Sequence, residues 1–147
     1  MQKILILYYS RTGNTQKMAE TVAEGAKTVQ GVQVELNYYA TPEELEDFDA
    51  VIVGVPTYHH DMTVEIKKLF EESAVKKVNL KAKIGAAFGS YGWSGEAPRL
   101  ALEIMKNKFG MDVIQSPLLV KYAPDQTALE KCKELGREVA ERLIHEV

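Results

Sequence analysis

The sequence predicts an α/β protein in which one parallel sheet lies between two layers of helices. Three apolar runs, Ile4–Tyr9, Ala50–Val55 and Ile84–Phe88, are continuous rather than alternating, as is typical of strands that are covered on both faces. Helical patterns separate these runs, and such alternation gives parallel strands joined by right-handed crossovers. Because neither a linker nor a repeat divides the chain, we expect one domain over residues 1–147.

The first half of the chain predicts two further helices and one further strand. Asn14–Val29 has apolar residues at helical spacing, and its first residue is a plausible N-cap. Val32–Tyr38 alternates apolar and polar residues, as a half-buried strand does. A short helix begins at Thr41–Glu44, where a capping threonine precedes a proline and two acidic residues. Pro56 ends the strand that follows.

The second half continues the same alternation. Pro98 favours a helix start, since proline fits the first turn. The expected elements are the helix Val64–Ser73, the helix Ala97–Phe109, an edge-like segment Asp112–Ser116, the strand Leu118–Tyr122 and a final helix over Thr127–Glu146.

The segment Ser10–Thr15 joins the first strand to the first helix and predicts a phosphate site. A helix N-terminus carries unsatisfied N–H groups and a partial positive charge, so it stabilises an anion without a lysine. The segment adds three hydroxyl groups, and Gly13 lets the backbone approach a ligand closely. It matches neither GxxxxGK[ST] nor GxGxxG, which points away from nucleoside triphosphates and from a Rossmann-type nicotinamide site. Taken alone, it also suits an ordinary strand-to-helix turn.

Two more loops follow strands of the predicted sheet, namely Pro56–Thr63 and Gly89–Gly95. Ligands of open α/β sheets bind beyond the carboxyl ends of the strands. Although aromatic residues make up only 8% of the chain, Tyr58, Tyr91 and Trp93 all fall in these loops. Such side chains can stack on a planar ring. A phosphate loop beside two ring-binding loops describes a ligand the size of a mononucleotide.

These segments resemble the FMN-binding loops of the flavodoxin family, and they are most similar to the flavodoxin-like domain of A-type flavoproteins, the flavodiiron proteins. The resemblance rests on Ser10–Thr15, Val55–Thr57 and Phe88–Gly95 (FGSYGWSG), and it covers essentially the whole chain. It implies a flavodoxin-like three-layer sandwich, with a five-stranded parallel sheet in the order 2-1-3-4-5. It also implies FMN as the cofactor.

The resemblance implies a cofactor site without catalytic or metal-binding residues. The first loop would hold the phosphate, Thr57 and the backbone of Gly89–Gly92 would bond the isoalloxazine edge, and Tyr91 and Trp93 would line or cover the ring. The expected cofactor-binding residues are Ser10, Arg11, Thr12, Gly13, Asn14, Thr15, Pro56, Thr57, Tyr58, His59, Gly89, Ser90, Tyr91, Gly92, Trp93 and Gly95.

The function implied by the resemblance is an FMN-containing electron carrier between larger redox enzymes, with a reductase and acceptor oxidoreductases as partners. An FMN-dependent NAD(P)H or quinone oxidoreductase is the alternative. The short loop Pro56–Thr63 argues against such an enzyme, because it leaves little to build a substrate pocket. The adjacent histidines and the low acidity argue for the enzyme. A phosphate-sensing or interaction module without flavin is a third possibility, which the clustered aromatic residues disfavour.

Composition excludes several other classes. The net charge is −3 without a basic stripe, so we expect no nucleic-acid partner. The apolar run at the N-terminus is too short for a signal peptide or a membrane span, so we expect a cytoplasmic protein. We also expect the protein to be monomeric or weakly dimeric. The single Cys132 excludes an intrachain disulfide and a cysteine-based metal cluster. The chain has only three histidines and no room for a second domain, so we expect no diiron domain.

Two features of the loops predict redox behaviour. Strongly acidic surroundings disfavour an anionic reduced flavin. Because Arg11, His59 and His60 replace such surroundings here, we expect a less negative second potential than in an acidic flavodoxin. The loop Thr57–Thr63 also lacks a glycine, so Asp61 is expected to tolerate a positive φ best, and weaker accumulation of the flavin radical is expected.

Overall fold

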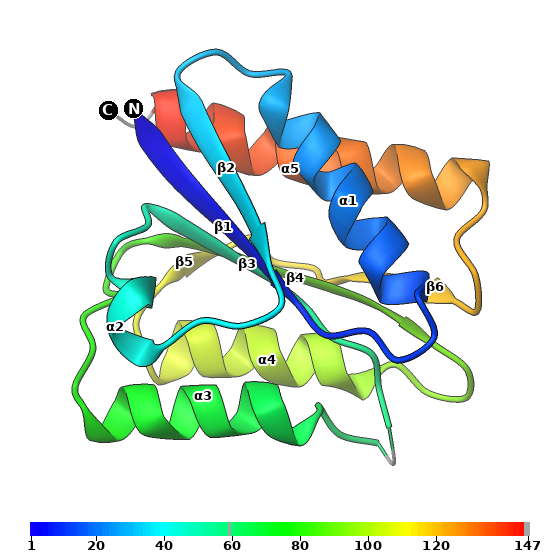
Figure 1. Ribbon diagram of the computed structural model, residues 1–147, viewed down its shortest axis with the longest axis horizontal. Coiled ribbons are helices and arrows are strands. Elements are labelled where there is room, and N and C mark those ends of the chain that lie inside the picture. Colours follow the sequence, from blue (N-terminus) through cyan, green and yellow to red (C-terminus); the bar gives the residue numbers. More distant parts are fainter. Residues whose placement is uncertain (59, 146–147) are drawn as a thin grey trace.

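Helices cover both faces of one parallel sheet in the computed structural model, which describes residues 1–58 and 60–145 (Figure 1). The strands are β1 (Gln2–Tyr8), β2 (Val32–Asn37), β3 (Ala50–Gly54), β4 (Ile84–Tyr91), β5 (Asp112–Val113) and β6 (Leu118–Lys121). The helices are α1 (Asn14–Lys27), α2 (Pro42–Leu45), α3 (Val64–Val75), α4 (Glu96–Asn107) and α5 (Gln126–His145). The predicted α/β fold class is confirmed.

The strand order is β2-β1-β3-β4-β5, which is the predicted order 2-1-3-4-5, and every pairing is parallel. The fifth position is occupied by two short strands rather than one. β5 pairs with the start of β4, where Asp112 lies beside Ile84, and β6 pairs with its end, where Lys121 lies beside Tyr91. The carboxyl ends of β1, β3, β4 and β6 consequently meet at one edge of the sheet.

The core lies on both faces of the sheet, which explains the continuous apolar runs. Successive residues of a strand point to opposite faces. Ile4 and Ile6 therefore pack toward α1 and α5, while Leu5 and Leu7 pack toward α3 and α4. Figure 1 shows these two helix pairs on opposite sides of the sheet. All four side chains are at most 1% exposed, and burial of each contributes about 1.5–3 kcal/mol.

The end of β4 differs from the prediction. The sequence predicts a strand that stops at Phe88, but pairing with β6 continues to Tyr91, so Gly89 and Ser90 belong to the strand. A Cβ atom at Gly89 would lie 1.9 Å from the backbone oxygen of Val55. Glycine is required here by the close approach of two backbones, and not by a loop.

The start of α1 also differs from the prediction. Its N-cap is Gly13, with a φ of 93°, and Asn14 is the first helical residue. Glycine takes this left-handed conformation at little cost, which explains why the chain turns one residue earlier than expected. The predicted start of α2 is confirmed, because Thr41 and Glu44 form a capping box in which each side chain accepts the backbone N–H of the other.

The only cysteine, Cys132 on α5, is fully buried, and burial raises the pKa of its thiol to about 12. Because the thiolate is the reactive form, we expect the folded protein to react with Ellman's reagent at pH 8 roughly 100-fold more slowly than the urea-unfolded chain. Absorbance at 412 nm under the two conditions gives the ratio. Equal rates would show that the thiol is accessible in the fold.

Candidate functional site

The loops that follow β1, β3, β4 and β6 enclose a cleft of about 200 Å³ at the carboxyl edge of the sheet. Larger hollows occur elsewhere. The one of about 330 Å³ at the amino ends of the strands is more open and has no aromatic lining, and one of about 270 Å³ lies beside α2 and α3, away from the loops at the carboxyl edge. The cleft at the carboxyl edge is lined by Thr12, Asn14, Pro56, Thr57, Tyr58, Ser90, Tyr91, Gly92 and Tyr122. Eight of these nine residues were predicted from the sequence, and Tyr122 was not.

The loop before α1 is suited to receive an anion. Gly13 N–H donates to Ser10 Oγ at 3.0 Å, which closes the turn, and no side chain caps the first amides of α1. α2, α3 and α4 each carry an acidic residue in the first turn, and Asp125 accepts the N–H of Ala128 at the start of α5. α1 carries none. An acidic side chain there would repel a bound phosphate, so its absence leaves the helix dipole available to a ligand.

A buried pair of hydroxyl groups joins this loop to β4. Thr15 Oγ1 and Ser90 Oγ lie 3.1 Å apart, and Ser90 N–H donates to Thr15 Oγ1 at 3.3 Å. The two residues are only 1% and 6% exposed. Both were predicted as ligand contacts. In the structure they bond each other, and they fix the first turn of α1 against the neighbouring strand.

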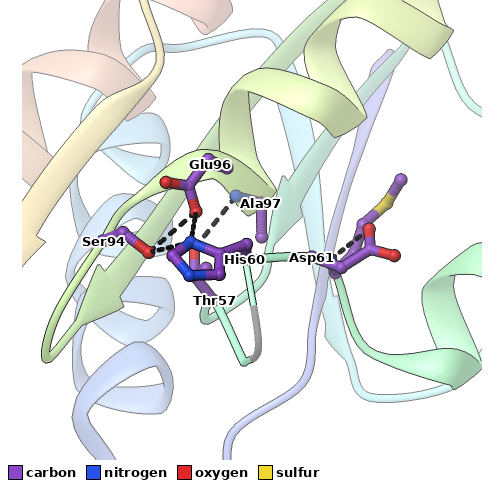
Figure 2. A network of polar contacts seen from close by, with 7 residues as sticks. Thr57, His60, Asp61, Ser94, Glu96 and Ala97 are labelled. Atoms are coloured by element: carbon purple, nitrogen blue, oxygen red, sulfur yellow. Dashed lines mark hydrogen bonds and ion pairs between the residues drawn. The ribbon is translucent and has the colours of Figure 1, made fainter.

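Thr57 makes a similar connection between the loop after β3 and α4. Its Oγ1 accepts the N–H of Ala97 at 2.9 Å (Figure 2), because the N-cap Gly95 has no side chain to offer. The hydroxyl hydrogen of Thr57 can still donate to a ligand in the cleft. The predicted contact with the edge of a planar ring is thus compatible with this second role.

Three tyrosines give the cleft its aromatic lining, namely Tyr58, Tyr91 and Tyr122. Burial raises the pKa of the Tyr58 phenol, and the Arg11 guanidinium, 4.6 Å from the ring centre, only partly opposes the rise. The phenol therefore keeps its proton at neutral pH. Tyr122 has a φ of 60°, and its backbone N–H donates to the backbone carbonyl oxygen of Tyr91 at 2.7 Å. The sequence signal for Tyr122 was its place at the end of the last strand, on the same sheet edge as the other loops.

Seven of the other predicted residues lie beside the cleft and do not line it. Trp93, which was expected to line or cover the ring, is 89% exposed. His59 lies outside the described residues. The predicted residues beside the cleft are Ser10, Arg11 and Gly13 in the first loop, Thr15 on α1, Gly89 on β4, and Trp93 and Gly95 before α4.

The left-handed residue of the loop after β3 is His60, with a φ of 65°, and not Asp61 as expected. Tyr58 and Asp61 exchange two backbone hydrogen bonds of 3.0 Å across a tight turn. The Asp61 carboxylate accepts the N–H of Met62 at 2.8 Å and pairs with Lys67, which holds Asp61 in place. Histidine is enriched at positive φ relative to most residues, so it is tolerated at this position.

Two kinds of feature are absent from residues 1–58 and 60–145. No three histidine, cysteine, aspartate or glutamate side chains gather as a metal site. None of the described helices has both the length and the apolar character that a transmembrane segment needs.

Comparison with known proteins identifies the family. The flavodoxin family model matches residues 6–136. The chain belongs to the flavodoxin family. A flavodoxin of Aquifex aeolicus is 32% identical over 96% of this chain and 86% of its own length. A solved flavodoxin from the domain Archaea matches 98% of this flavodoxin and 100% of that chain, with a TM-score of 0.89 and 38% identity.

The similarity to A-type flavoproteins is also confirmed. The type A flavoprotein fprA of Rhodobacter capsulatus is 34% identical over 95% of this flavodoxin. This flavodoxin spans only about a third (33%) of that relative's length. A flavodiiron core from Synechocystis matches with a TM-score of 0.82 and 26% identity, and 37% of that chain is covered.

FMN, the cofactor of the family, suits the cleft of this flavodoxin. The start of α1 offers uncapped amides without a competing carboxylate, next to an aromatic cleft with hydroxyl groups at Thr12 and Thr57. Bound FMN supplies reversible uptake and release of electrons, while the protein binds and orients it.

Proposed function

We propose that this flavodoxin is a single-domain carrier that passes electrons between a reductase and acceptor oxidoreductases, and that it oxidises neither NADH nor NADPH by itself. The observation that carries the proposal is the loop after β3, which folds back on itself between Tyr58 and Asp61. A loop closed so tightly does not extend into a roof over the cleft. Enzymes of related fold that bind a second substrate against the flavin generally need such a roof or another subunit.

The residues proposed to bind FMN divide into two groups. The turn Ser10–Gly13 and the first amides of α1 hold the phosphate, with Thr12 and Asn14 in the cleft. Thr57, Tyr58, Tyr91 and Tyr122 surround the flavin ring. Thr15 and Ser90 support both groups, because their mutual bond connects α1 to β4.

Anaerobic mixing tests the carrier proposal directly. FMN-loaded protein is mixed with excess NADH or NADPH while the flavin absorbance near 450 nm is followed, and free FMN serves as the control. We expect the protein flavin to stay oxidised for as long as free FMN does, until a flavodoxin reductase is added. Rapid bleaching without a reductase would instead support the NAD(P)H oxidoreductase.

The cytoplasmic location and the monomeric or weakly dimeric state stay predictions. Cell fractionation and light scattering at several protein concentrations check them.

A further inference from the structure

The two edges of the sheet differ in how they are closed. One edge is divided between β5 and β6, which are two and four residues long. The other edge is β2, a six-residue strand whose register with β1 runs without interruption from Gln2 and Val32 onward (Figure 1). Proteins commonly protect an open edge with short strands, bulges, prolines or lysines. β2 has none of these features, and Glu35 is its one charged residue.

The backbone of β2 alternates between β1 and the open edge. Gln2 N–H donates to Gly31 O at 3.1 Å, and Gln2 lies beside Val32. Because the hydrogen bonds of a parallel pair recur at every second residue, the odd-numbered residues of β2 bond β1. The N–H and C=O groups of Val32, Val34 and Leu36 consequently point away from β1. In the described part of the chain, β1 is the one strand that pairs with β2, so these groups are available to another strand.

The side chains of β2 alternate as well. Those of Val32, Val34 and Leu36 are half-buried and pack toward α1 and α5. The side chains of Gln33 and Glu35 are exposed on the other face. Directly opposite residues of two antiparallel strands lie on the same face of a sheet. A strand that pairs well with β2 therefore has apolar residues at alternate positions, as β2 itself does.

We propose that β2 is a self-association surface, at which the β2 strand of a second copy of this chain pairs antiparallel to it. A two-fold axis at Val34 joins the two sheets into one. Val34 then lies opposite Val34 of the second copy, Val32 lies opposite Leu36, and Gln33 lies opposite Glu35. The apolar side chains all fall on one face of the joined sheet. On the other face, the Gln33 amide can donate to the Glu35 carboxylate of the second copy.

Other alignments of the two strands are less favourable. A centre at Glu35 would place two carboxylates opposite each other, and like charges at opposite positions are destabilising. A centre between Val34 and Glu35 would bring side chains of opposite faces together. The charge and the apolar pattern of β2 therefore favour the alignment at Val34. Because a two-fold contact uses the same surface on both copies, association is complete with the dimer.

The proposed interface is small, so the dimer is weak. A contact of one strand per copy buries less than the roughly 1,200–2,000 Å² of stable complexes. Tyr38 and Tyr39 follow β2 directly and are 80% and 69% exposed. They add apolar area at the end of the strand, beside the turn that precedes β2 of the second copy. The proposal thus gives a surface to the weakly dimeric state that the sequence leads us to expect.

The dimer leaves the clefts of both copies open. The cleft is formed by the loops that follow β1, β3, β4 and β6, and no residue of β2 lines it. Self-association at β2 is therefore compatible with the carrier function and does not depend on it.

Sedimentation velocity of the FMN-loaded protein at low salt, from about 5 µM to about 1 mM, tests the proposal. We expect a monomer–dimer equilibrium. Gln33→Lys places a cation opposite Glu35 of the second copy and should tighten the dimer, whereas Gln33→Glu places two carboxylates opposite each other and should weaken it. The contact occurs twice in a two-fold dimer, so we expect the dissociation constant to change roughly two- to tenfold in each direction.

Gln115 provides the matched control. It is exposed between β5 and β6, at the opposite edge of the sheet. Gln115→Lys and Gln115→Glu change the net charge by the same amounts as the Gln33 variants, and they should change the dissociation constant less than about twofold.

A backbone variant tests the open edge directly. Val34→Pro removes an N–H that points away from β1, and edge strands tolerate proline at such positions. We expect this variant to retain FMN and to stay monomeric at the highest concentration. In the parent protein, amide exchange measured by NMR should slow with concentration at Val32, Val34 and Leu36, whose N–H groups enter the new pairing.

Each remaining outcome contradicts the proposal. A parent protein that stays monomeric throughout overturns it, and β2 is then an edge that a strand of another protein could cover. A dimer that responds alike to the Gln33 and Gln115 variants forms through another surface. Association that continues beyond the dimer contradicts the two-fold contact. Because none of these outcomes involves reduction of the flavin, the carrier function is tested separately.

Discussion

Replacing Gly136 by alanine is expected to destabilise the protein by about 2 kcal/mol or more. A Cβ atom at this position of α5 would lie 2.0 Å from the backbone oxygen of Val22 on α1. The contact is reciprocal, because a Cβ at Gly25 of α1 would lie 2.0 Å from the backbone oxygen of Lys133. Alanine favours a helix by about 1 kcal/mol over glycine. Separating two packed helices costs more than this gain, since backbone atoms cannot rotate away.

Urea unfolding of the FMN-free protein, followed by circular dichroism, measures this effect. Arg137→Ala is the matched control, since Arg137 is the exposed neighbour of Gly136 on the same helix, and its stability should stay within about 0.5 kcal/mol of the parent protein. A Gly136→Ala variant as stable as the control would show that α1 and α5 can separate at no cost.

Much of the fold was predictable because burial imposes a local pattern on the sequence. A strand covered on both faces must be apolar throughout, which identified β1, β3 and most of β4. Gly136 was not identified, because a glycine within a helix appears unfavourable until the partner backbone is known. Gly89 and Ser90 were assigned to a loop because the segments that they contact are not apparent from the local sequence. Their roles depend on Val55 and Thr15, which lie far away in sequence.

The site was predictable to the extent that its chemistry is local. Ser10–Thr15 provides hydroxyl groups and a helix start within six residues, which suits a phosphate, and the two aromatic loops favour this interpretation over an ordinary strand-to-helix turn. The polar contacts that join His60 to Ser94 and Glu96 have no such signal, because 34 residues separate His60 from Ser94. The positive φ expected at Asp61 is found at His60, and the Asp61 carboxylate is held by Lys67 and by the N–H of Met62. The less negative second potential, which was expected from Arg11, His59 and His60, stays a prediction. A redox titration of the bound flavin checks it.

Replacing Thr12 by aspartate is expected to weaken FMN binding by about 100-fold or more. Thr12 is exposed and lines the cleft two residues before α1. A carboxylate there would face the phosphate, and like charges a few ångströms apart repel by on the order of 3–4 kcal/mol near a protein surface. The same substitution should leave the FMN-free protein at least as stable, because a negative charge near a helix N-terminus contributes about 0.3–1 kcal/mol. Weaker binding would then reflect the ligand and not unfolding.

Fluorescence titration with FMN and with riboflavin, which lacks the phosphate, locates the effect of Thr12→Asp. Thr127→Asp is the matched control, because it adds the same charge to the exposed first turn of α5, outside the lining of the cleft. FMN affinity should fall only in Thr12→Asp, and riboflavin affinity should be similar in both variants. If riboflavin binding fell as much as FMN binding, Thr12 would contact the flavin ring. The phosphate would then have to bind elsewhere than at the start of α1, the described helix whose first amides lack both an acidic neighbour and a side-chain cap.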